Sequence, residues 1–107
     1  MVEEITGPEV AERLRRDPMS VVLLDVRELW EREVAAIHPS IHIPLAEISQ
    51  RLDELPKDCT VVVYCHSGAR SAMVAGFLDS RGFSRVLNLA GGIDAWSVEV
   101  NPELPRY

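Results

Sequence analysis

Cys65 is the residue of this sequence best placed to act as a nucleophile. It follows the apolar run 60–64 and begins the segment Cys-His-Ser-Gly-Ala-Arg-Ser, residues 65–71. A short glycine-containing loop that opens into a helix can direct successive backbone N–H groups toward one point and attract negative charge there. The positive end of the helix and the guanidinium of Arg70 strengthen the same field. Because all three effects lower the pKa of a thiol, we expect Cys65 to react as a thiolate.

Charged and small residues follow two other apolar runs. Asp25 and Arg27 come at the end of the run 21–24, and Gly91 and Gly92 come just after the run 85–89. Asp25 and Arg27 are candidates for a supporting role in catalysis, but we expect a structural ion pair that fixes the end of a strand. Two successive glycines favour a close approach of two backbone segments.

The remaining polar and aromatic candidates have simpler interpretations. Cys59 is interpreted as a small apolar or surface residue, and a strand between the two cysteines would hold them roughly 20 Å apart at about 3.3 Å per residue. A disulfide needs Cα atoms within about 7 Å, so we expect both thiols to stay reduced. The histidines lack the spacing of a zinc site, and no metal or cofactor is expected. His66 is expected to be solvated, and Trp30 and Trp96 to be packing residues.

The elements that would position these residues follow from periodicity and from helix-breaking residues. Thr6 and Glu9 have the spacing of a capping box, which predicts a helix ended by Asp17-Pro18. Apolar runs predict buried strands at 21–24, 60–64 and 85–89 and an extended piece at 41–43. Further helices are predicted over 29–36, 48–55 and 73–78 and around Trp96. The proline-rich tail, 101–107, is expected to lie extended on the surface.

This alternation of strands and helices predicts an α/β fold, with a parallel central sheet and helices on both faces. Ligands of such sheets bind beyond the carboxyl ends of the strands. Asp25, Cys65 and Gly91 all fall at such ends, so one edge of the sheet could collect all three. The length of 107 residues fits a single domain over residues 1–107.

Charge and hydropathy exclude several classes of partner. The formal net charge of −6 argues against nucleic-acid binding, which needs a basic face. The longest apolar runs are strand-sized and far too short to span a bilayer, so no membrane partner is expected. The start, Met-Val-Glu-Glu, lacks the basic and apolar regions of a signal peptide, and we expect a cytoplasmic protein.

Three segments together resemble the rhodanese family, in the order that this family uses. They are Leu24-Asp25-Val26-Arg27-Glu28, the loop 65–71, and Leu89-Ala90-Gly91-Gly92-Ile93-Asp94-Ala95-Trp96. The end of the chain is similar to that of rhodanese domains fused to adenylyltransferases that activate sulfur-carrier proteins. The segment 35–40, Ala-Ala-Ile-His-Pro-Ser, departs from the Gly-His-Ile-Pro-Gly-Ala-like stretch usual in the family.

The resemblance implies a rhodanese-like fold and an enzyme of the thiosulfate sulfurtransferase type. Cys65 would take a sulfane sulfur from a small anionic donor, thiosulfate or a related persulfide, and pass it to a thiol, cyanide or protein acceptor. The surrounding substrate- and anion-binding loop would consist of His66, Ser67, Gly68, Ala69, Arg70 and Ser71. Ser71 is expected to cap the following helix and also to contact the substrate.

Two alternatives from other classes remain open. Cysteine-dependent phosphatases and arsenate reductases resemble Cys-x5-Arg, whereas four residues separate Cys65 from Arg70 here. The shorter loop suits a single sulfur better than a tetrahedral phosphate, and no aspartic general acid is evident. A non-catalytic module that docks a partner would be expected to lack the cysteine altogether.

Overall fold

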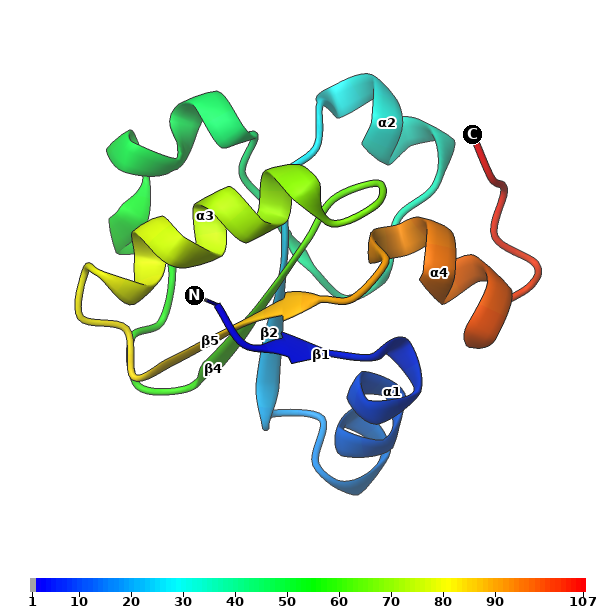
Figure 1. The fold of residues 1–107 in the computed structure, drawn as a ribbon, viewed down its shortest axis with the longest axis horizontal. Coiled ribbons are helices and arrows are strands. Elements are labelled where there is room, and N and C mark those ends of the chain that lie inside the picture. The colour runs from blue at the N-terminus through cyan, green and yellow to red at the C-terminus, as the bar shows by residue number, and fades with distance from the viewer. Residues whose placement is uncertain (1) are drawn as a thin grey trace.

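Five parallel strands form the centre of the computed structural model, which describes residues 2–107 (Figure 1). They are β1 (Glu4–Ile5), β2 (Val21–Asp25), β3 (Ile41–His42), β4 (Thr60–Tyr64) and β5 (Arg85–Leu89). Their order in the sheet is β1-β5-β4-β2-β3, and every neighbouring pair is parallel. The predicted parallel α/β architecture is therefore confirmed, and β4, the strand before Cys65, lies at its centre.

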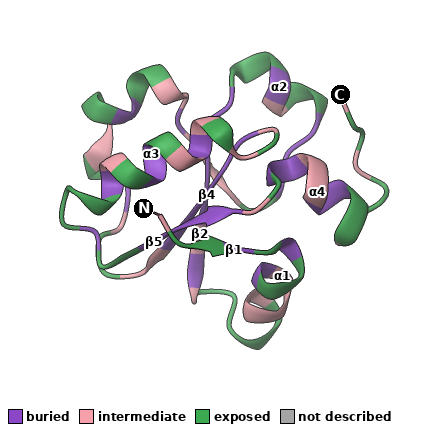
Figure 2. Ribbon diagram, viewed as in Figure 1, coloured by how far each residue is buried: buried purple, intermediate pink, exposed green. Residues whose placement is uncertain are grey.

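Side chains alternate along β4 and supply a core on each face of the sheet. Val61 and Val63 belong to the core beneath α3 (Ala69–Asp79), whereas Val62 and Tyr64 belong to the core beneath α1 (Gly7–Arg16) and α4 (Gly92–Glu99). These four side chains are fully buried, and Figure 2 shows the inner strands buried between the helices, whereas part of the outer strand β1 is exposed. Burial of each such side chain contributes about 1.5–3 kcal/mol, so the end of β4 is firmly held.

The predicted capping box begins α1 as expected. The backbone N–H of Thr6 donates to Glu9 Oε1 at 2.9 Å, and the backbone N–H of Glu9 donates to Thr6 Oγ1 at 3.2 Å. The helix ends at Arg16, just before Asp17. Two N–H groups that a free helix end would leave unpaired are thus satisfied.

Two predictions about the elements were wrong in part, and one strand was missed. The segment predicted as a helix over 48–55 forms two 3₁₀ helices, η1 (Leu45–Gln50) and η2 (Leu52–Glu54), whose backbone closes i to i+3 bonds. Helix α2 (Leu29–Val34) ends two residues early, because Ala35 is extended. Strand β1 was not predicted, since two residues show no periodicity.

The two tryptophans differ in burial. Trp96 packs in the core beneath α1 and α4, as expected. Trp30 is 59% exposed on α2 and does not belong to the core, but its ring packs edge-on against Tyr107 with centroids 5.7 Å apart. No helix within residues 2–107 has the length and apolar character needed to cross a membrane.

Candidate active site

The carboxyl ends of three adjacent strands bring the predicted residues to one edge of the sheet. β2 ends at Asp25, which is paired in register with Tyr64, the last residue of β4. Cys65 follows directly, and Gly91 comes two residues after the end of β5, which pairs with β4 on its other side. The structure therefore gathers Asp25, Cys65 and Gly91 where the topology was expected to place them.

The loop after β4 curls around the sulfur of Cys65. The backbone N–H of Gly68 donates to Sγ at 3.1 Å, and the backbone N–H of Ser71 donates to it at 3.4 Å. Gly68 has φ of 117°, a left-handed conformation that glycine adopts without a steric penalty. Helix α3 begins at Ala69, so the positive end of its dipole also faces the sulfur. Ser67 and Ala69 are exposed.

These contacts control the pKa of the thiol. Burial raises the pKa of Cys65, which is 1% exposed, but hydrogen bonds from the Ser71 hydroxyl and from the N–H groups of Ser71, Gly68 and Arg70 outweigh burial and hold that pKa below its usual value. Burial and the charge of Asp58 raise the pKa of Cys59. Since the thiolate is the nucleophile, Cys65 is the more reactive thiol.

The hydroxyl of Ser71 links the sulfur to a residue that sequence reasoning missed. Ser71 Oγ lies 3.4 Å from Sγ and 2.5 Å from Asn88 Oδ1. A thiolate attracts the single hydroxyl proton strongly because it is charged. Asn88 is buried in β5, and its amide donates to the Gly68 carbonyl at 3.2 Å. The sequence signal that could have identified Asn88 was a polar residue within the predicted buried strand 85–89.

The glycines after β5 hold the loop from its other side. A side chain at Gly92 would collide with the carbonyl oxygens of Cys65 and His66. Those carbonyls accept the N–H of Ile93 at 2.9 Å and the N–H of Asp94 at 3.0 Å. The predicted close approach of backbone is therefore present, and the start of α4 fixes the beginning of the sulfur loop.

Asp25 and Arg27 form the expected ion pair, with both side chains fully buried. Arg27 Nε and Nη2 donate to the two Asp25 carboxylate oxygens at 2.9 and 2.8 Å, and Arg32 and Tyr64 each donate to Oδ2 at 3.1 Å. Burial raises the pKa of Asp25, but its bonds to Arg27 outweigh burial and hold that pKa below its usual value. The pair joins the end of β2 to its surroundings.

Arg70 has a partner that was not predicted. Its Nη1 and Nη2 donate to the two carboxylate oxygens of Glu31 at 2.7 and 2.8 Å. Glu31 lies on α2, 39 residues earlier in the chain. The cation beside the sulfur loop is therefore balanced by a carboxylate, a contact that no local pattern could reveal.

The end of the tail returns to the site, so the expectation of an extended surface segment fails at Tyr107. Its hydroxyl donates to Glu31 at 2.8 Å and accepts from Arg27 Nη1 at 2.9 Å. Its ring stacks on His66 with centroids 4.3 Å apart. The expectation that His66 is merely solvated was therefore wrong. Its Nε2 also lies 4.0 Å from Asp94 Oδ1.

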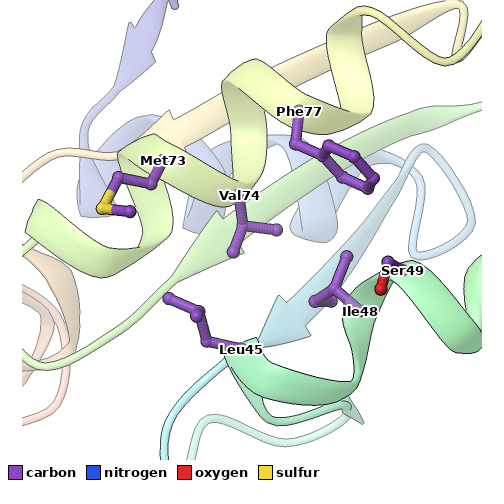
Figure 3. Close-up of a pocket in the computed structure, with 6 residues that line it drawn as sticks. All are labelled: Leu45, Ile48, Ser49, Met73, Val74 and Phe77. Atoms are coloured by element: carbon purple, nitrogen blue, oxygen red, sulfur yellow. The ribbon is translucent and has the colours of Figure 1, made fainter.

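An apolar cavity of about 210 Å³ lies between α3 and η1 (Figure 3). It is lined by Leu45, Ile48, Ser49, Met73, Val74 and Phe77. None of these six side chains carries a titratable group.

Comparisons with known proteins find both sequence relatives and solved structures with this fold. The family model for the rhodanese-like domain matches residues 6–99. A sulfurtransferase from Allochromatium vinosum is 42% identical over 97 residues, which are 91% of this chain and 90% of that protein. An adenylyltransferase and sulfurtransferase from Arabidopsis thaliana is 32% identical over 96% of this chain but only 25% of its own length. A solved rhodanese-related protein from Thermoplasma volcanium superposes with a TM-score of 0.84 at 31% identity, covering 94% of this chain and 95% of its own.

Proposed function

We propose that this chain, which belongs to the rhodanese-like domain family, carries a sulfane sulfur as a persulfide on Cys65. Membership and the sulfurtransferase relatives make it an enzyme of the rhodanese type. The observation that carries the proposal is the set of N–H groups from Gly68 and Ser71 aimed at one sulfur. A persulfide places its negative charge beside the same donors, which act as an oxyanion hole does.

The first half-reaction loads the sulfur from thiosulfate or a related persulfide donor. The Cys65 thiolate attacks the outer sulfur of thiosulfate, a new S–S bond forms, and the bond to the sulfonate sulfur breaks with its electron pair leaving on sulfite. Sulfite is a stable anion, so the step needs no general acid.

In the second half-reaction a thiol or cyanide attacks the outer sulfur and restores the Cys65 thiolate. A protein acceptor is also proposed, since relatives include a putative sulfur carrier protein from Bacillus subtilis.

A matched pair of assays tests this reaction against phosphate hydrolysis. Wild-type protein is expected to form thiocyanate from thiosulfate and cyanide, and not to release nitrophenol from an aryl phosphate or reduce arsenate. The physical reason is the loop of four residues between Cys65 and Arg70, which suits one sulfur and not a tetrahedron of oxygens. Insertion of a glycine after Ser67 is expected to weaken sulfur transfer. Aryl phosphate hydrolysis at a comparable rate, lost in Cys65→Ser, would overturn the proposal.

A further inference from the structure

Glu31 forms an ion pair with Arg70, the cation that would otherwise be available to bind an anionic substrate. Both terminal nitrogens of Arg70 donate to it, in the end-on geometry that binds carboxylates best. The Glu31 side chain is 4% exposed, whereas that of Arg70 is 37% exposed, so the carboxylate lies behind the guanidinium. The pair is neutral as a unit.

The carboxylate is held too firmly to leave easily. Besides Arg70, it accepts the backbone N–H of Glu28 at 3.0 Å and the hydroxyl of Tyr107 at 2.8 Å. Hydrogen bonds from Arg70 come first among the causes that lower the pKa of Glu31 to about 2, against the opposing effect of burial. Glu31 therefore stays ionised, and paired with Arg70, throughout the neutral range.

The other hydrogen-bond donors at the site can stabilise only one negative charge. The N–H groups of Gly68 and Ser71 point at the sulfur of Cys65 and would stabilise a single thiolate or persulfide. Arg70 belongs to the same loop, and the bonds to Glu31 and, to a smaller extent, the charge of Cys65 raise its pKa. Arg27 is fully buried against Asp25 and cannot meet a donor molecule.

We propose that Glu31 is a specificity-determining residue that favours monoanionic sulfur donors, the class of thiosulfonates and alkyl persulfides, over the thiosulfate dianion. The second charge of thiosulfate would have to lie beside an already neutralised Arg70 and near the Glu31 carboxylate. A thiosulfonate has an organic group in place of that charge, and it releases a sulfinate instead of sulfite. This inference rests on sulfur transfer through Cys65.

Thiosulfate and methanethiosulfonate provide the test, because they present the same outer sulfur and differ by one charge. Their leaving groups also differ, so the informative quantity is the change in their kcat/KM ratio between wild type and Glu31→Gln, with cyanide as acceptor. Glu31→Gln keeps an oxygen acceptor but removes the charge. We expect kcat/KM for thiosulfate to rise about tenfold, equivalent to about 1.4 kcal/mol, mainly through KM. For methanethiosulfonate we expect a rise below about threefold.

Glu33→Gln is the matched control, since it removes the same charge from an exposed position on the same helix. It is expected to leave the ratio of kcat/KM for thiosulfate to kcat/KM for methanethiosulfonate at the wild-type value. An equal effect of Glu31→Gln on both donors, or an equal shift by Glu33→Gln, would contradict the inference. If neither donor modifies Cys65 in the wild type, the proposed function itself fails.

A measurement on the wild type alone covers the case in which Glu31→Gln does not fold. Sulfate and methanesulfonate are both tetrahedral and differ by one charge, and each is tested as a competitive inhibitor against methanethiosulfonate. Methanesulfonate is expected to inhibit at least as strongly as sulfate. Sulfate inhibition about tenfold tighter would show that Arg70 remains available to dianions and would overturn the inference.

Discussion

Replacement of Cys65 by serine is expected to abolish sulfur transfer, with a loss in kcat of at least about 10³-fold. A serine hydroxyl has a far higher pKa than a thiol and cannot form a persulfide. Cys59→Ser is the matched control and is expected to keep wild-type activity, because Cys59 lies before β4, at the opposite end of that strand from the loop. Both variants are compared by thiocyanate formation, with circular dichroism to establish that each is folded.

Comparison of the two cysteine variants tests directly which cysteine is the nucleophile. An inactive Cys59→Ser with an active Cys65→Ser would contradict the assignment of the nucleophile. Loss of activity in both folded variants would indicate a mechanism that needs two thiols. The loop around Cys65 contains only one thiol, so that result would also contradict the assignment.

The second large effect is expected on stability. Asp25→Ala leaves the fully buried Arg27 without its carboxylate, and loss of one partner of a buried ion pair costs about 3–5 kcal/mol in the free energy of unfolding. Urea denaturation measures the change. Glu12→Ala is the control, because it breaks exposed ion pairs with Arg15 and Arg16 and should change stability little. An Asp25→Ala protein as stable as Glu12→Ala would refute a structural role for the pair.

Acid should remove the advantage that Asp25 provides. Its pKa is depressed in the folded protein, so the unfolded chain binds the proton first. The stabilisation is fully present above the pKa of the unfolded carboxyl, about 3.9, and is lost as the pH falls through the folded value. The stability difference between wild type and Asp25→Ala should therefore be constant near neutral pH and shrink only in acid.

The parts of the fold that were predictable have strong local causes. β2, β4 and β5 are rich in apolar β-branched and leucine side chains because both faces of a parallel sheet are buried. The capping box at Thr6 identified the start of α1. Local patterns could not distinguish a helix from the 3₁₀ turns of η1 and η2, since both place Ile48 and Leu55 against the core. The pairing of β1 with β5 depends on tertiary contacts alone.

The site also has a part that local sequence predicts and a part that depends on tertiary contacts. Cys65, Gly68 and Ser71 lie within seven residues, so their arrangement follows from a strand, a tight turn and a helix start. Glu31 and Tyr107 are 39 and 76 residues from the groups they contact, and nothing in their own neighbourhoods indicates chemistry. Contacts of that kind depend on how α2 and the tail pack beside the loop.

The mass of the intact protein after treatment with a sulfane-sulfur donor tests the persulfide most directly. Wild type and Cys59→Ser are expected to gain one sulfur, about 32 mass units, as covalent catalysis by Cys65 requires. Cyanide should remove that mass and yield an equal amount of thiocyanate, and Cys65→Ser should gain nothing. An unchanged wild-type mass with both thiosulfate and methanethiosulfonate, or a cyanide-removable sulfur on Cys65→Ser, would contradict the account.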